Sequence, residues 1–447
     1  MFSVIIPVHN SEKTIEDTLV NILDESPHFE DEIIIVNDGS TDGTNDILNK
    51  FKSNTKVKII NQSNQGVSSA RNTALENLSE QSEFVIFVDD SDYLGENFFE
   101  YALDYFKKNK EIDIAVTPMT IIENEQRKSN NLNYKFDTQY DVIDIMKDFQ
   151  SIHYHIGGVI FRKKLFARDY YRFDESISYW EDAKLINSIF IEKQYYGLIK
   201  KATYFYNRND GFSLSHTAWN SSKRYSHQIE ANYFQLIRDS IRKYGRNLEY
   251  VQFLLANHFL EYVREHNQTK INYKFLLEDV EFSLNSKKMF RYISVNTIDK
   301  LKAPNSSKNY LYYLKDTPFP YYRYFDKINL YIQHYDFSKR ELLFSFSPEA
   351  YGIPANSTIH FSKNSNEYLK ATLHSEKFFV ILGTQFDDFS RNIYKVKLSL
   401  RKLLFGCNII IVVKNLNKVV RIKNPSIATR LFKKVRLNKK ISKNKYL

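Results

Sequence analysis

Cysteine is almost absent from this sequence, which contains a single one, Cys407. One cysteine excludes an internal disulfide and argues against a thiolate metal site, which is usual for proteins of reducing compartments. Long apolar runs are also missing, since no stretch reaches the roughly 18 apolar residues that a membrane-spanning helix needs. The N-terminus enters a strand pattern with no basic region before it. We therefore expect a cytoplasmic protein.

Acidic residues are missing from the C-terminal part of the chain. None of the 53 Asp and Glu residues follows Asp388, whereas 17 of the 63 Lys and Arg residues do. The net charge of +10 thus belongs to this last part, and its distribution argues against nucleic-acid binding by the rest of the protein. The basic tail, residues 426–447, is expected to contact anionic lipid surfaces or polyanionic polymers, or else to be a solubilising disordered segment.

Glycine is absent from the first predicted turn between a strand and a helix, which reads His9-Asn10-Ser11-Glu12. The glycine-rich fingerprint of dinucleotide-binding proteins is therefore missing, and no GxxxxGK[ST] motif occurs elsewhere. These absences disfavour a conventional NAD-binding or P-loop protein.

Four short apolar runs alternate with helical patterns in the first hundred residues, at 2–7, 32–37, 56–60 and 84–88. This alternation predicts right-handed crossovers and a mainly parallel sheet. Further strands are expected at 112–116, 157–162 and 201–206, with a polar surface excursion over 124–150 and a helix from Glu181.

The fourth run ends abruptly in three carboxylates, Asp89, Asp90 and Asp92. Carboxylates this close repel one another unless a cation lies between them, and open α/β sheets bind their ligands at the carboxyl ends of the strands. The segment predicts either a divalent-metal site or a solvated turn.

At 447 residues the chain is too long for one ordinary core. We predict an α/β protein with a Rossmann-like catalytic domain over residues 1–218 and a helical linker region over 219–335. Seven alternating runs then predict a β-sandwich-like accessory domain over 336–425, followed by the basic tail. The many aromatic residues of the helical region are interpreted as core.

Five motifs occur in order: SVIIPVHNSE, IVNDGSTDGT, NQGVSSARNTAL, FVDDSDYL and WEDAKL. In this order they resemble glycosyltransferase family 2, whose members have the GT-A fold and include inverting, nucleotide-sugar-dependent enzymes. The resemblance covers roughly residues 1–216. The helical region and C-terminal strands are similar in layout, though not in motifs, to bacterial enzymes that glycosylate wall teichoic acid and related surface polymers.

The resemblance implies a nucleotide-sugar site in which Asp38 holds the uracil edge, while Asn64 and Arg71 contact the base and the diphosphate. The alternatives are that Asn10 and Asp38 cap turns and that Arg71 is a surface helix charge. The residues implied for this site are Pro7, His9, Asn10, Glu12, Asp38, Asn64, Arg71, Asp89, Asp90, Arg208 and Ser213.

The resemblance also implies Mn²⁺ or Mg²⁺, with Asp90 and Asp92 as ligands and His216 as a further candidate. The family commonly has Asp-X-Asp-Asp, whereas this chain places Ser91 at the third position. Either the loop shifts so that Asp90 and Asp92 serve as the ligand pair, or metal binding is weakened or mediated by water.

Asp182 corresponds to the base that family members use to accept the proton of the acceptor hydroxyl, and Glu181 would orient the acceptor or the loop. Alternatively, both acids only cap a helix. The expected activity is transfer of a hexose or N-acetylhexosamine from a UDP-sugar to a polymeric or lipid-linked glycan acceptor. The tail is expected to allow peripheral membrane contact, and self-association into a homo-oligomer is a further expectation. The rival functions are a catalytically degenerate sugar-nucleotide-binding scaffold, suggested by Ser91, and a nucleotidyltransferase on a similar fold.

Overall fold

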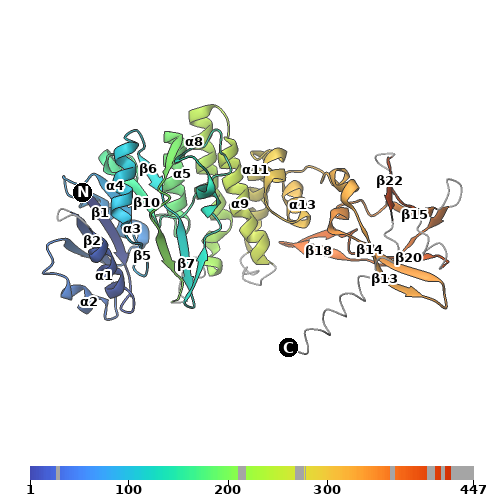
Figure 1. Cartoon of the computed structure of the whole chain (residues 1–447), viewed down its shortest axis with the longest axis horizontal. Coiled ribbons are helices and arrows are strands. Elements are labelled where there is room, and N and C mark those ends of the chain that lie inside the picture. Colours follow the sequence, from blue (N-terminus) through green and yellow to red (C-terminus); the bar gives the residue numbers. More distant parts are fainter. Residues whose placement is uncertain are drawn as a thin grey trace. The chain divides into compact units, whose positions relative to one another are not determined.

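The computed structural model describes residues 1–26, 31–209, 218–266, 276, 278–362, 368–399, 408–413 and 418–423 (Figure 1). The chain divides into two compact units. The first consists of Met1–Glu261 and Gln268–Thr297, and the second of Tyr262–Asn267 and Ile298–Leu447. The region predicted as a separate helical linker is therefore shared between the two units.

The first unit is built on an eight-stranded sheet in the order β3-β2-β1-β4-β10-β6-β11-β9. The first four strands in sequence are parallel to one another, which confirms the predicted parallel core, whereas β10 runs antiparallel to both neighbours. The strands are β1 Phe2–Val8, β2 Glu32–Asp38, β3 Val57–Gln62, β4 Phe84–Phe87, β6 Ile114–Val116, β9 Val142–Asp144, β10 Val159–Arg162 and β11 Tyr195–Leu198.

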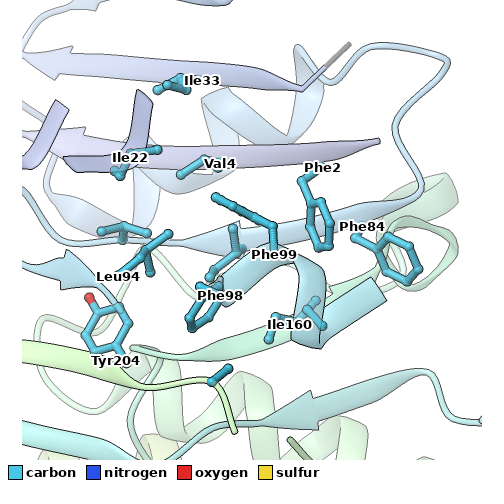
Figure 2. Close-up of a cluster of buried hydrophobic side chains, with 14 of the residues drawn as sticks. Phe2, Val4, Ile22, Ile33, Phe84, Leu94, Phe98, Phe99, Ile160 and Tyr204 are labelled. Carbon is cyan, nitrogen blue, oxygen red and sulfur yellow. The ribbon is translucent and has the colours of Figure 1, made fainter. Parts of the chain in front are cut away.

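Helices connect these strands and cover both faces of the sheet. The even-numbered residues of β1 share a core with α1 and α4, whereas α3 packs on β1 and β2 outside that cluster. Figure 2 shows this core, in which the Phe2 ring lies 5.1 Å from Phe84 and 4.9 Å from Phe99, between ring centroids. The helices are α1 Ile15–Glu25, α2 Thr44–Lys50, α3 Val67–Glu76, α4 Phe98–Lys108 and α5 Glu181–Lys193.

The α1 helix shows how the sequence pattern produces this packing. Its residues Ile15, Leu19 and Ile22 recur at helical spacing and are fully buried, while Glu16 and Asp17 occupy the first turn. Acidic side chains there are favoured by the partial positive charge of the helix N-terminus.

The region 124–150 was expected to be a polar surface excursion, and this prediction is wrong in part. Strand β8 is exposed, but β9 forms an edge of the main sheet, and Lys135 lies 2% exposed in η1. A second sheet, β5-β12-β7-β8, contains the predicted strand β12 and three strands that were not predicted. The strands of this second sheet are β5 Tyr93–Leu94, β7 Met119–Glu123, β8 Gln126–Ser129 and β12 Tyr204–Asn207. The first unit also contains the 3₁₀ helices η1 Asn133–Asp137 and η2 Lys163–Asp169.

The aromatic-rich region after residue 218 is helical, as predicted, and its aromatic side chains are largely core. Tyr225, Tyr233 and Tyr250 are fully buried. The elements are η3 Ala218–Asn220, η4 Ser222–Arg224, α7 Ser226–Gln228, the π-helix η5 Ile229–Tyr233, α8 Phe234–Tyr244, α9 Glu249–His266, α11 Val280–Arg291, α12 Val295–Lys300, α13 Asn305–Leu314 and η6 Tyr321–Lys327. Among the described helices, none has both the length and the apolar character that a membrane span requires.

The second unit contains two four-stranded antiparallel sheets, β13-β14-β20-β17 and β16-β15-β21-β22, and the hairpin β18-β19. Both sheets contribute to one core, in which Phe344 and Phe361 lie 5.2 Å apart between ring centroids, so the predicted β-sandwich is confirmed. Its elements are β13 Leu330–Asp336, β14 Glu341–Phe346, η7 Pro348–Ala350, β15 Thr358–Ser362, β16 Tyr368–Lys370, β17 Thr372–Ser375, β18 Phe378–Ile381, β19 Thr384–Asp387, β20 Ile393–Lys397, β21 Asn408–Val413 and β22 Lys418–Lys423.

Candidate active site

The loops after β1 and β2 interlock at the carboxyl edge of the main sheet. His9 Nδ1 lies 2.9 Å from the Asp38 carbonyl oxygen, and the Asn10 side chain accepts a 2.8 Å hydrogen bond from the Thr41 N–H. Glu12 accepts a 2.8 Å hydrogen bond from the Gly43 N–H. Asn10 has a positive φ of 54°, which asparagine tolerates better than most residues. Pro7 is buried in β1 directly before this loop.

The Asp38 carboxylate is 3% exposed and accepts three hydrogen bonds from within the protein. The donors are Gln62 Nε2 at 2.8 Å, the Gln65 N–H at 2.9 Å and the Gly66 N–H at 2.8 Å. Asp38 therefore stabilises the turn that leads into α3, which agrees with the alternative prediction that Asp38 caps a turn. The predicted contact with a uracil edge stays a prediction. Asn64 lies beside His9, with its side-chain nitrogen 3.2 Å from His9 Nε2.

The three carboxylates after β4 have different environments. Asp92 is 1% exposed, and it accepts hydrogen bonds from the Tyr204 hydroxyl at 2.6 Å and the Asn207 N–H at 2.9 Å. Burial, together with repulsion from Asp89, raises the pKa of Asp92 well above its usual range. Asp92 thus ties the acidic segment to β12.

The other two carboxylates of this segment, Asp90 and Asp89, differ in burial, and the predicted metal role of Asp90 and Asp92 stays a prediction. Burial raises the pKa of Asp90 to about 6, and the nearby Asp89 adds to this rise, although a hydrogen bond from the Ser11 hydroxyl opposes it. The Asp89 side chain is 40% exposed. A divalent cation beside this pair would relieve the repulsion, and oxygen ligands suit Mg²⁺ or Mn²⁺. Within the described ranges, no group of three or more His, Cys, Asp or Glu side chains is arranged to hold a metal ion.

Arg71 is buried at the centre of the site, at 3% exposure, so its alternative interpretation as a surface helix charge is wrong. Its guanidinium group donates to Asp89 at 3.0 Å and to Glu181 at 2.9 Å, and lies 5.2 Å from the centroid of the Phe173 ring. One cation thereby joins the end of β4 to the start of α5. The predicted contact of Arg71 with a diphosphate stays a prediction.

Trp180 precedes the acidic pair Glu181-Asp182 and has a left-handed backbone, with φ 69° and ψ 20°. Such a conformation costs a bulky residue about 1–3 kcal/mol unless the surroundings hold it in place. Here the Trp180 ring stacks on His258 at 4.3 Å and meets Tyr233 edge-on at 5.3 Å, between centroids. The packing of Trp180 therefore sets the direction in which α5 begins.

Asp182 Oδ2 accepts a 3.1 Å hydrogen bond from the Ile156 N–H. Burial raises the pKa of Asp182 to about 7, and repulsion from Glu181 adds to the rise, while Arg71 opposes it. A carboxylate with this pKa is ionised above neutral pH and is basic enough to take a proton from a hydroxyl group in a transition state. The arrangement can therefore support general-base catalysis.

Comparison with known proteins agrees with this geometry. The family described as Glycosyl transferase family 2 matches residues 3–170. The minor teichoic acid biosynthesis protein GgaA of Bacillus subtilis (strain 168) is 32% identical over 322 residues, which are 70% of this chain and 71% of that protein. The chain belongs to glycosyltransferase family 2. GgaB of the same organism is 32% identical over 284 residues, which are 62% of this chain but only 30% of GgaB.

Solved structures of S. aureus TarS have the same fold as this glycosyltransferase. The complex of TarS residues 1–349 with UDP-GlcNAc aligns with a TM-score of 0.54 and 19% identity, covering 72% of this chain and 89% of that one. The longer TarS structure aligns with a TM-score of 0.52 and 14% identity over 95% of this chain and 77% of that one. The predicted fold class is confirmed, with a mainly parallel GT-A sheet and a β-rich C-terminal region.

Some predicted site residues of this glycosyltransferase lie at or beyond the limit of the described structure. Arg208 follows β12, where its side chain is exposed and its guanidinium carbon lies 5.1 Å from the centroid of the Tyr206 ring. Ser213 and His216 fall outside the described residues. The predicted roles of Arg208, Ser213 and His216 stay predictions.

Sequence reasoning missed several residues that support the site. Tyr204 holds Asp92 and lies against Gly157 and Gly158, where an added Cβ would come within 2.9 Å of the Tyr204 side chain at each glycine. A glycine pair at the start of a predicted strand is a sequence signal for such close packing. Lys135 and His153 were also missed, because a buried lysine is rare and no local pattern announces it.

Proposed function

We propose that this chain is an inverting glycosyltransferase that moves a hexose or N-acetylhexosamine from a UDP-sugar to a hydroxyl group of a teichoic acid or a related surface-polymer precursor. The observation that carries the proposal is the Asp182 carboxylate at the start of α5, where burial raises its pKa to about 7 and the charges of Arg71 and Asp89 act on it. The donor is suggested by the TarS complexes with UDP-GlcNAc and UDP, and the acceptor by the name of GgaA.

In the proposed mechanism, Asp182 accepts the proton of the acceptor hydroxyl as its oxygen attacks the anomeric carbon from the side opposite UDP. The bond from the anomeric carbon to the phosphate oxygen breaks, UDP leaves, and the configuration inverts. Glu181 is held by Arg71 at 2.9 Å and keeps the start of α5 in place. Asp182 needs to be ionised for this step, so the rate should fall as the pH drops below about 7.

A divalent cation, Mn²⁺ or Mg²⁺, would neutralise the charge that develops on the departing diphosphate. We propose Asp90 as its direct ligand, next to Asp89, with Asp92 and His216 as the further ligands predicted from the sequence. Asp92 already accepts two hydrogen bonds, so we expect it mainly to position the acidic segment.

Release of UDP tests the function directly. Purified protein incubated with UDP-GlcNAc or another UDP-sugar and Mn²⁺ should release UDP, even without acceptor, by slow hydrolysis. Removing the cation with EDTA should weaken UDP binding in calorimetry, because the diphosphate loses its counter-charge. A degenerate scaffold would release no UDP and bind it without metal dependence, and a nucleotidyltransferase would release pyrophosphate instead.

We also propose that the basic tail, residues 426–447, brings this glycosyltransferase to an anionic surface such as the inner face of the membrane or the polymer itself. Truncation after Asn424 should then abolish binding to phosphatidylglycerol vesicles, and binding of the full chain should weaken steeply as salt is raised. Equal vesicle binding by the truncated and full chains would contradict this role. Self-association is a separate expectation that sedimentation of the full chain would measure.

A further inference from the structure

A buried group of polar residues that the proposed mechanism does not use is connected to Asp182, the candidate base, by hydrogen bonds. Lys135 and His153 are 2% and 1% exposed. The Lys135 ammonium donates to the Ile152 carbonyl oxygen at 2.8 Å and lies 3.0 Å from His153 Nδ1. A buried lysine without a carboxylate partner is costly, so its position requires an explanation.

The hydrogen-bond directions in this group are fixed by its chemistry. Lys135 only donates when charged, so His153 Nδ1 accepts, and the single proton of the neutral ring then lies on Nε2. Burial and the neighbouring Lys135 lower the pKa of His153 well below its usual range, which keeps the ring neutral. His153 Nε2–H donates in turn to the His155 carbonyl oxygen at 2.9 Å.

That carbonyl belongs to the peptide bond between His155 and Ile156, and the N–H of the same peptide bond donates to Asp182 Oδ2 at 3.1 Å. A continuous chain of hydrogen bonds therefore runs from the Lys135 amine through the His153 ring and one peptide group to the candidate base. A hydrogen bond at a peptide oxygen polarises the N–H of that peptide and strengthens the hydrogen bond that the N–H donates.

We propose that Lys135 and His153 are positioning residues that fix the His155–Ile156 peptide and, through its N–H, set the orientation and basicity of Asp182. The inference rests on the proposed function, because it needs Asp182 to be the base. We call this chain of hydrogen bonds, from Lys135 through His153 and the His155–Ile156 peptide to Asp182, the relay. The Lys135 amine can donate to His153 in both its charged and its neutral form, so the relay persists on both sides of neutral pH.

The titratable groups that face the two ends of the relay differ. Glu181, Arg71 and Asp89 act on Asp182, whereas Lys135 and His155 act on His153. A variant at Lys135 or His153 leaves the first three unchanged, so a shift in the pKa of Asp182 in such a variant reports on the relay.

The test is the pH profile of kcat/KM for Lys135→Met and His153→Leu, both apolar replacements of similar length. Weakening the hydrogen bond from the Ile156 N–H removes stabilisation from the ionised Asp182 carboxylate and raises its pKa. The acid limb of the profile, where kcat/KM falls with decreasing pH, should therefore move to higher pH by about half a unit to one unit. Well above that limb, where Asp182 is ionised, kcat should fall by no more than about ten-fold, through poorer orientation of the base. The double variant should shift the limb no further than the larger single shift, because the two residues act in series.

Tyr250→Phe is the matched control. The Tyr250 hydroxyl donates to Asn187 Oδ1 at 2.7 Å, and Asn187 Nδ2 donates to the His153 carbonyl oxygen at 2.9 Å, so this change loosens the same buried region without breaking the relay. It should lower the melting temperature and leave the acid limb in place.

Two results separate the inference from the proposed function. If Asp182→Asn still transfers sugar, the base assignment fails and the inference fails with it. If Asp182→Asn is inactive but the acid limb of Lys135→Met or His153→Leu stays at the wild-type position, the relay alone is overturned. Should Lys135→Met not fold, His153→Leu decides between these outcomes, and Lys135→Gln, which keeps a donor, should restore much of the wild-type profile.

Discussion

Replacing Asp182 with asparagine should lower the rate of sugar transfer by about 10²- to 10⁴-fold, the usual contribution of a general base. The asparagine side chain keeps the shape of the aspartate, and its carbonyl oxygen can still accept from the Ile156 N–H. It cannot take up a proton from the acceptor. Initial rates of UDP release with acceptor present would measure the loss, and UDP binding measured by calorimetry should be unchanged.

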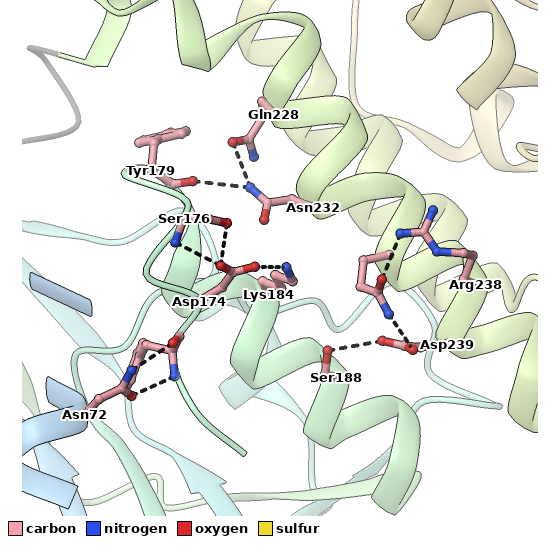
Figure 3. A network of polar contacts seen from close by, with 12 residues as sticks. Asn72, Asp174, Ser176, Tyr179, Lys184, Ser188, Gln228, Asn232, Arg238 and Asp239 are labelled. Carbon is pink, nitrogen blue, oxygen red and sulfur yellow. Dashed lines mark hydrogen bonds and ion pairs between the residues drawn. The ribbon is translucent and has the colours of Figure 1, made fainter. Parts of the chain in front are cut away.

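Asp174 provides a matched control for that experiment. Its carboxylate is also held at the start of a turn, where it accepts a hydrogen bond from Ser176 and forms a 2.6 Å ion pair with Lys184 (Figure 3). Asp174→Asn should leave the transfer rate within about three-fold of the wild type, since partly exposed ion pairs contribute little. Substantial activity in Asp182→Asn, or an equal loss in both variants, would contradict the role of Asp182.

Replacing Arg71 with methionine should reduce the free energy of unfolding by about 3–5 kcal/mol, the usual cost of removing one partner of a buried ion pair. The change leaves the Glu181 carboxylate, whose side chain is 10% exposed, without its cation. Urea unfolding followed by circular dichroism would measure the loss. Adding Glu181→Gln to the Arg71 variant should recover part of it, because the unpaired charge is then gone.

The Lys50–Glu16 pair is a suitable comparison for Arg71. It joins two exposed side chains at 3.0 Å, with exposed fractions of 58% and 48%. Lys50→Met should change the free energy of unfolding by less than about 1 kcal/mol. A similarly small effect of Arg71→Met would show that Arg71 does not hold the ends of β4 and α5 together.

The parallel part of the fold could be predicted because its strands are buried on both faces and therefore read as continuous apolar runs. The missed strands lack that signal. Strand β5 has two residues, β8 is fully exposed, and β9 pairs along only one edge. Strands β5 and β9 form beside β12 and β11, which are distant in sequence, and local patterns do not encode such pairing. Strand β8 pairs with the preceding strand β7, but its four exposed polar residues give no apolar alternation.

The chemistry of the site was also predictable from its motifs, whereas the partners of each side chain were not. The sequence places Asp38, Arg71 and Asp92 at the sheet edge, but it does not show that protein groups already bind all three. Those partners lie 18 to 115 residues away along the chain. The buried position of Lys135, in a stretch that looks solvated, was hidden for the same reason.

The stacking of Trp180 on His258 has a consequence for how this protein could be divided. The backbone of Trp180 is strained, and the side chains that hold it come from η5 and α9, after residue 218, at which the predicted catalytic domain ends. A fragment that ends at residue 218 would expose the Trp180 indole ring. The turn that orients Glu181 and Asp182 would then lose the packing that holds it. The smallest autonomous catalytic piece of this chain is therefore expected to extend beyond residue 218 and to include the helices that cover Trp180.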